Sequence, residues 1–146
     1  LSHGAEKSFY DALDISSTPI VCSHSNCKAL CDVPRNLTDD QLRALAAKGG
    51  VAHTTLYGGF LRKDGAANIT DAIAHLEHAI RIMGIDHVGL GTDFDGDGGI
   101  IGLADSSELI QFTLQLLRRR YSERDIANIW GGNWLRVMTQ AQQQKD

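Results

Sequence analysis

The sequence has 146 residues, a usual length for one globular domain. Hydrophobic residues make up 42% and charged residues 22%, a composition typical of folded chains and not of disordered ones. The formal net charge is -4 and no basic block occurs, which argues against nucleic acid as a partner. No apolar run is long enough for a membrane segment, and no lysine-rich amphipathic stretch indicates a membrane surface.

Three cysteines, Cys22, Cys27 and Cys31, lie close together in the chain. Their odd number is a poor disulfide framework, and their spacing matches none of the common zinc pairs. We therefore expect buried thiols, which favour a reducing compartment such as the cytoplasm.

The apolar pattern alternates short strands with amphipathic helices. Strands are predicted at 19–23, 51–56 and 87–91. Helices are predicted at 7–15, from a capping box of Thr38 and Gln41 to Gly49, from Asn68 or Thr70 to Gly84, and from a capping box of Asp105 and Glu108. Two shorter helices are predicted at 122–130 and from 133 onward, followed by a polar, frayed tail at 140–146.

This order predicts parallel strands joined by crossover helices. Ile20, Val51 and Val88 are equivalent points, and their spacing is close to the ~31 residues per unit of an eight-unit barrel. We therefore predict an α/β fold, the C-terminal half of a (β/α)8 TIM-type barrel, with 1–146 forming roughly four βα units of a single barrel domain. Only residues 1–3 represent the first strand, so we expect the N-terminal portion to be missing from this chain.

Ionisable side chains follow the predicted strands, at the end where parallel α/β folds place their sites. His3 follows the first strand, His24 follows the second between Ser23 and Ser25, and Asp93 follows the last. Two imidazoles and a carboxylate suit a first-row metal ion and hydrolysis. A lone histidine at a strand end is more often a hydrogen-bonded structural residue than a metal ligand.

The run 93–98 has the D-x-D-x-D-G opening of a calcium loop. Its twelfth position is Ala104 instead of a glutamate, and a strand leads into it, so the calcium interpretation fails. We expect Asp93 to project into the site and Asp95 to support it from outside the ligand set.

Other candidates lie on loops and on the longest helix. Arg35 could grip a carboxylate bidentately, or pair with Asp32 or Asp39 on the surface. Tyr57 could line the same pocket or simply pack. His75 and His78 have a spacing that can bind metal, but they share their helix with apolar residues, so we expect them to pack against the sheet. His53 and His87 are placed near strand beginnings and carry no functional prediction.

Several motifs together resemble the renal (membrane) dipeptidase family of zinc peptidases. They are Ser23-His24-Ser25-Asn26, Arg35-Asn36-Leu37-Thr38-Asp39-Asp40, His75-Leu76-Glu77-His78, Gly84-Ile85-Asp86-His87-Val88-Gly89, Asp93-Phe94-Asp95-Gly96 and Gly132-Asn133-Trp134-Leu135-Arg136-Val137. The match extends over nearly the whole chain with order and approximate spacing preserved.

The resemblance implies a metallo-dipeptidase on a (β/α)8 barrel with two Zn2+ per complete active site. Members cleave dipeptides, often with a D-residue at the C-terminal position, and some open β-lactams. A hydroxide bridging the metals attacks the peptide carbonyl. His3 and His24 match the histidines of the second zinc, and Asp93 matches the aspartate that binds the first zinc and shuttles the proton. Arg35 matches the arginine that binds the substrate carboxylate, and Tyr57 falls where the family lines its pocket.

The family's His-x-Asp pair, its bridging glutamate and a further substrate-binding histidine have no match here. The resemblance implies that they lie before Leu1, so activity is expected only together with the N-terminal portion of the same enzyme. A homodimer is left open. Two alternatives remain: another amidohydrolase-type metal hydrolase, acting on cyclic amides or phosphotriesters, or a non-catalytic module with an incomplete metal site.

Overall fold

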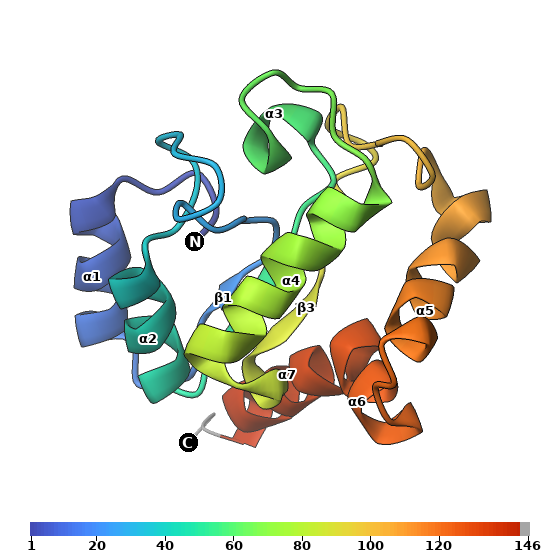
Figure 1. Cartoon of the computed structure of the whole chain (residues 1–146). Coiled ribbons are helices and arrows are strands. Elements are labelled where there is room, and N and C mark those ends of the chain that lie inside the picture. The colour runs from blue at the N-terminus through green and yellow to red at the C-terminus, as the bar shows by residue number, and fades with distance from the viewer. Residues whose placement is uncertain (144–146) are drawn as a thin grey trace.

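The computed structural model describes residues 1–143, which form a three-stranded parallel sheet with helices packed around it (Figure 1). The strands are β1 (Val21–Cys22), β2 (Val51–Thr54) and β3 (Val88–Leu90), in the order β1-β2-β3. Parallel neighbours joined through helices confirm the predicted α/β fold. Closure of such a sheet into a barrel stays a prediction.

Seven α-helices belong to the described part of the chain. They are α1 (Glu6–Ile15), α2 (Asp39–Ala47), α3 (Gly58–Leu61), α4 (Ile69–Met83), α5 (Leu109–Arg118), α6 (Glu123–Ala127) and α7 (Asn133–Gln143). Two 3-10 turns, η1 (Ile85–His87) and η2 (Ser106–Glu108), and a π turn, η3 (Asn128–Gly132), connect them. None of these helices has the length and apolarity needed to cross a membrane.

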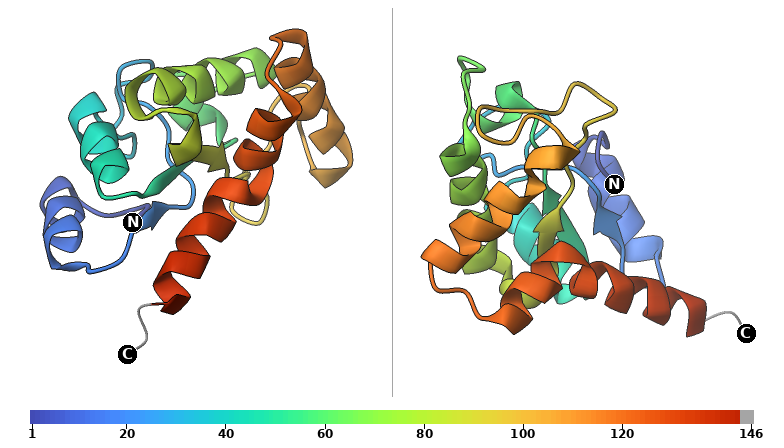
Figure 2. Two further views of the ribbon diagram at one scale, coloured as in Figure 1. Left: turned by 90° about the horizontal axis from the view of Figure 1, so that it is seen from below. Right: turned by 90° about the vertical axis from the view of Figure 1, so that its right-hand side faces the viewer.

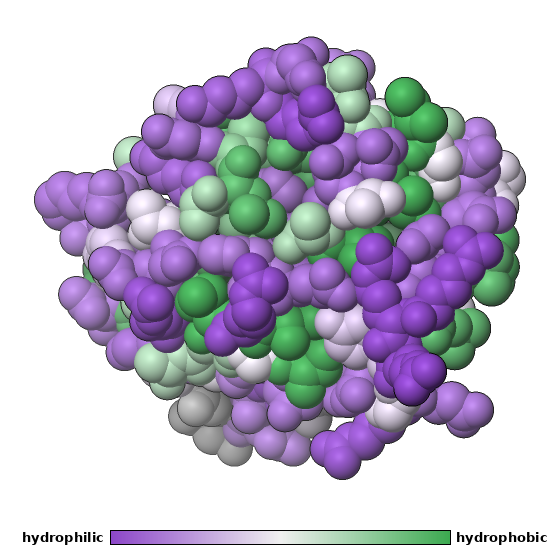
Figure 3. Space-filling model, in the orientation of Figure 1, coloured by the Kyte–Doolittle hydropathy of each residue, from purple (hydrophilic) through white to green (hydrophobic). Residues whose placement is uncertain are grey.

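Helix α4 lies across the strands, with α1 and α2 on one side of it and α5 on the other (Figure 1). Its inner face buries Ile73 and Leu76 completely, against Leu45 of α2 and Val88 of β3 within one continuous core. Each such side chain contributes about 1.5–3 kcal/mol when fully buried. The outer face is mainly polar, with separate apolar patches (Figure 3).

The starts of α2 and α4 are set by reciprocal capping. Thr38 Oγ1 accepts from the backbone N–H of Gln41 at 3.2 Å, and Gln41 Oε1 accepts from the N–H of Thr38 at 2.9 Å. Asn68 and Asp71 form the equivalent pair at α4. Both pairs satisfy backbone donors that a helix start leaves free, which confirms the predicted starts.

The strands are shorter than predicted because their ends bond elsewhere. The N–H of Thr55 donates to Asn26 Oδ1 at 3.1 Å, and that of Leu56 donates to the carbonyl of Thr92 at 3.4 Å. Residues 1–3 form a turn instead of a strand, although the Leu1 amino group donates to the Val21 carbonyl of β1.

Two predictions at the C-terminal half are wrong in detail. Asp105 Oδ1 accepts from the N–H of Ser107, and Glu108 Oε2 accepts from that of Ala104, so the expected reciprocal box does not form. Asp105 caps η2 instead, and α5 begins only at Leu109. The helix predicted at 122–130 gives way to the π turn at Asn128.

Helix α7 runs along the base of the sheet and extends beyond it (Figure 2). The Arg136 guanidinium donates to the carbonyls of Gly49 and Asp86, each at 2.9 Å, and Asn133 Nδ2 donates to those of Ile85 and Val88, each at 2.8 Å. The helix continues through 140–143, so the frayed tail is wrong there. The rest of that predicted tail lies outside the described residues.

Candidate active site

The imidazoles of His3 and His24 meet at the carboxyl end of the sheet. Their Nε2 atoms are 2.8 Å apart and the rings stand edge to face. His24 follows β1 directly, and His3 is brought beside it by the turn of residues 1–3. At this distance one Nε2–H donates to the other Nε2. Imidazole nitrogens are ligands that zinc prefers, so these two side chains are of a type that could hold one metal ion together.

Serine hydroxyls surround His24. Ser23 Oγ lies 2.8 Å from His24 Nδ1, and Ser2 Oγ accepts from the backbone N–H of His24 at 2.9 Å. Ser2 also contacts Ser25 Oγ at 3.0 Å. Burial lowers the pKa of His24, and the negative charge of Asp93 offsets part of this effect. The ring is therefore held towards its neutral form, in which a nitrogen can bind metal.

Arg35 adds a cation to the pair. Its Nη2 donates to His3 Nε2 at 3.1 Å, and its guanidinium carbon lies 4.9 Å from the centre of the Phe60 ring. Arg35 forms no ion pair with Asp32 or Asp39 in the described structure. Asp32 pairs with Lys28, and Asp39 pairs with His78. Burial lowers the pKa of Arg35 and the Asp93 charge raises it.

Tyr57 lies at the same end of the sheet. It precedes α3, is half-buried, and its ring centre is 4.5 Å from that of Phe60. Asn36, beside Arg35, donates through Nδ2 to the carbonyls of Cys31 and Phe60, both at 2.8 Å. This buried amide fixes the Arg35 loop, a role that sequence reasoning missed although Asn36 belongs to the motif quoted for the family.

Asp93 follows β3 and turns the chain sharply. Its carbonyl accepts from the N–H groups of Gly96 and Gly98 at 2.9 and 2.8 Å. Gly96 passes over the Asp93 carboxylate so closely that a Cβ there would lie 2.7 Å from Oδ1. Asp95 is exposed in the turn, and its supporting role stays a prediction.

Both His3 and Asp93 have left-handed backbone conformations, with φ of 71° and 61°. Non-glycine residues occupy this region at a cost of about 1–3 kcal/mol, and such residues cluster at functional sites. Two of the expected ligands thus carry backbone strain, a signal that only the structure provides.

His75, His78 and the three cysteines are buried, as predicted. His75 Nδ1 accepts from the N–H of Cys27 at 3.0 Å, and Nε2 donates to the Leu61 carbonyl at 3.1 Å. The three thiols are free and buried, and burial raises the pKa of Cys22 to about 11 and that of Cys27 to about 12. His53 lies within β2, not near its beginning, and packs against Trp134.

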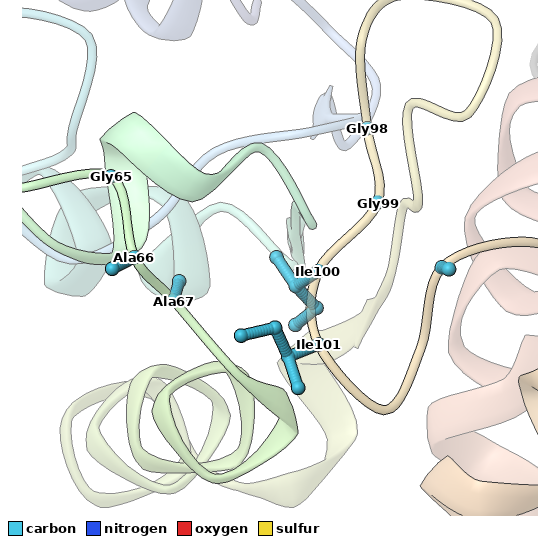
Figure 4. Close-up of a pocket in the computed structure, with 8 residues that line it drawn as sticks. Gly65, Ala66, Ala67, Gly98, Gly99, Ile100 and Ile101 are labelled. Atoms are coloured by element: carbon cyan, nitrogen blue, oxygen red, sulfur yellow. The ribbon is translucent and has the colours of Figure 1, made fainter.

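A hollow of about 550 Å³ lies between the loops that follow β2 and β3 (Figure 4). Its lining is Gly65, Ala66, Ala67, Gly98, Gly99, Ile100, Ile101 and Ala104. These side chains offer no acid, base or metal ligand, so the lining of the hollow supplies no group for catalysis.

Within residues 1–143, no group of three or more His, Cys, Asp and Glu side chains is placed to hold a metal ion. His3 and His24 contact each other through Nε2, and no third such side chain joins them in this part of the chain. The charge of Asp93 acts on both His24 and Arg35, which places it on the same side of the molecule.

The family model for membrane dipeptidases (peptidase family M19) matches residues 1–146. The chain belongs to this family. It is 40% identical to an uncharacterized protein from the pqqA 5' region of Klebsiella pneumoniae, over 99% of this chain and 55% of that protein.

Two solved structures share the fold of this M19 chain. One is the probable dipeptidase PvdM from Pseudomonas aeruginosa, with a TM-score of 0.93 and 26% identity, over 98% of this chain and 50% of the other. The second is a metallopeptidase from Rhodobacter sphaeroides with a phosphinate mimic of L-Ala-D-Ala, with a TM-score of 0.90 and 34% identity, over 96% and 41%. The M19 chain thus spans about half the length, or less, of these relatives.

Proposed function

We propose that this protein acts as a zinc-dependent dipeptidase with two zinc ions in its complete active site. One observation carries the proposal: His3, His24 and Arg35 converge at the carboxyl end of the sheet, and Asp93 follows β3 at the same end. A metal-binding pair next to a cation suits a small substrate with a free carboxylate.

Each side chain has a separate role in the proposed reaction. His3 and His24 would hold one zinc ion through Nε2, and Asp93 would contribute to the other. Bound zinc supplies an activated water near neutral pH and polarises the peptide carbonyl. Asp93 takes the proton from the attacking water and returns it to the leaving amine, as general base and then general acid. Asp95 supports Asp93.

Arg35 sets the length of the substrate. A guanidinium binds a terminal carboxylate through two parallel hydrogen bonds, and Phe60 holds it in place from one side. Only one residue then fits between that carboxylate and the scissile carbonyl. Tyr57 lines the pocket for this residue. The phosphinate mimic of L-Ala-D-Ala in the Rhodobacter structure makes L-Ala-D-Ala a suitable first substrate.

The remaining ligands would come from the N-terminal portion of the same enzyme, in which this chain forms the C-terminal half of a (β/α)8 barrel. Two facts support this part of the proposal. The solved relatives are about twice as long as the matched region. The described residues bring only His3 and His24 to one metal position.

The test is Arg35→Ala in the complete enzyme, assayed on L-Ala-D-Ala and on its C-terminal amide. For L-Ala-D-Ala, KM should rise about 10–100-fold, the amount expected for the loss of a charge-assisted hydrogen bond. For the C-terminal amide, KM should change little. Arg43→Ala is the matched control, because Arg43 is exposed on α2 and pairs with Asp40 at 2.8 Å.

Equal losses on both substrates would refute the role of Arg35. Zinc analysis of the same preparations tests the metal, and two ions per chain are expected. Turnover of a cyclic amide in place of the dipeptide would instead favour the amidohydrolase alternative.

A further inference from the structure

We propose that Ser23 and Ser2 are positioning residues that orient His24 and hold it against His3 for metal binding. The inference rests on the proposed function, since it concerns the same metal pair. The residues that carry it are the three serines around His24, which we call the serine clamp: Ser2, Ser23 and Ser25.

Ser23 determines which ring nitrogen of His24 carries the proton. A neutral imidazole binds metal through Nε2 only when its proton is on Nδ1, so Nδ1 then needs an acceptor. Ser23 Oγ lies 2.8 Å from Nδ1 and can accept a hydrogen bond from Nδ1–H. In the metal-free pair, Arg35 can only donate, so His3 Nε2 is the acceptor, and His24 Nε2–H shares the same lone pair as a second donor. Ser23 must then donate to Nδ1.

A hydroxyl suits both states, because it can donate or accept at the same place. A carboxylate at this position could only accept and would favour one tautomer throughout. The serine thus lets the His24 proton move from Nε2 to Nδ1 when a metal ion arrives, with no change in the direction of the ring.

The backbone of Ser23 is fixed independently. A Cβ at Gly91 would lie 1.8 Å from the Ser23 carbonyl oxygen, so these two chain segments are in contact with no room between them. The Ser23 hydroxyl is therefore presented from a rigid position at the end of β1, and it can hold the ring in one orientation.

Ser2 acts on the other histidine. It precedes His3 directly, and its hydroxyl accepts from the His24 backbone N–H while contacting Ser25 Oγ. A hydroxyl has one proton and two lone pairs, so Ser2 Oγ can accept from the His24 N–H and also share a hydrogen bond with Ser25 Oγ. These two bonds tie the strained turn of His3 to the turn of His24. The clamp thereby sets the 2.8 Å separation of the Nε2 atoms.

The test uses the complete, metal-free protein with 15N-labelled histidine and Zn2+ as the probe. Zn2+ affinity is measured by competition with a chelator, and ring 15N shifts report the tautomer of His24. Ser23→Ala should weaken Zn2+ binding about 10–100-fold, the loss typical of groups that orient metal ligands. Ser23→Thr keeps the hydroxyl and should restore most of the affinity.

Two further variants separate the roles. Ser2→Ala should also weaken Zn2+ binding while the His24 ring keeps its Nδ1–H tautomer in the zinc-bound protein. Ser17→Ala, at an exposed serine in the bend after α1, is the matched control and should bind Zn2+ like the wild type.

Two outcomes would overturn the inference in different ways. If Zn2+ changes the ring 15N shifts of His3 and His24 in Ser23→Ala as it does in the wild type, and binds both proteins with equal affinity, the positioning role is refuted and the dipeptidase proposal stands. If Zn2+ leaves both rings unchanged in the wild type, the metal site itself is refuted.

Discussion

Replacing Gly91 by alanine should open the candidate site. Gly91 follows β3 and lies directly against the end of β1, where a Cβ would be 1.8 Å from the Ser23 carbonyl oxygen and 3.0 Å from His53 Cβ. Ordinary contacts begin at 3.4 Å, so the two segments must separate by about 1.6 Å. Ser23 precedes His24 and Gly91 lies two residues before Asp93, so the separation moves both site residues.

This separation should lower both the free energy of unfolding and the rate of catalysis. Overpacking costs about 1–3 kcal/mol of unfolding free energy, and we expect the upper end because a backbone oxygen cannot rotate away. Misplacement of a catalytic group by about 1 Å can cost about 100-fold in rate. Gly91→Ala should therefore lose about 3 kcal/mol in stability and about 100-fold in dipeptide turnover.

The assay combines urea unfolding with dipeptide hydrolysis by the complete enzyme, at a temperature where the variant remains folded. Gly50→Ala is the matched control. Its Cβ would lie 2.4 Å from the Ile20 carbonyl oxygen, a similar clash at the start of β2 and hence at the opposite end of the sheet. Both variants should lose stability, but only Gly91→Ala should lose turnover per folded molecule. Normal turnover in Gly91→Ala, or equal losses in both, would refute the reasoning.

Two further predictions concern stability. Burial lowers the pKa of His75, so the unfolded state binds the extra proton. The free energy of unfolding should therefore fall as pH drops below about 6.5, by up to ~1.4 kcal/mol per pH unit. His75→Gln should flatten this slope in urea titrations between pH 7 and 5, and an unchanged slope would contradict the assignment. Leu76→Ala in the core of α4 should cost about 2–5 kcal/mol in thermal or urea unfolding, whereas Leu117→Ala, exposed on α5, should cost under about 0.5 kcal/mol.

Local chemistry explains which elements the sequence could predict. Helices α2 and α4 begin at capping boxes and end at glycines, and these signals act within a few residues. The strand ends depend instead on distant partners: Thr55 leaves the sheet for the Asn26 side chain, 29 residues away. Similarly, Asp105 and Glu108 have capping chemistry, but their bonds go to other backbone groups than the pattern predicts.

The candidate site divides in the same way. Strand order places His3, His24 and Asp93 at one end of a parallel sheet, and the family resemblance adds Arg35. The contacts among them are not local, because Arg35 meets His3 across 32 residues and Ser2 meets His24 across 22. Left-handed backbone at His3 and Asp93 could not be predicted from the sequence, because Asp and His adopt it more often than most residues but still only rarely.

The hydrogen bonds of Arg136 affect how the chain folds during translation. One guanidinium satisfies the carbonyls of Gly49 and Asp86, residues that a ribosome adds long before it reaches position 136. Until that arginine emerges, the base of the growing sheet lacks its closing partner, and the early βα units remain open to water and to other chains. Helix α7 therefore closes the sheet where β2 and β3 begin, and translation that stops short of it should leave a product prone to aggregation.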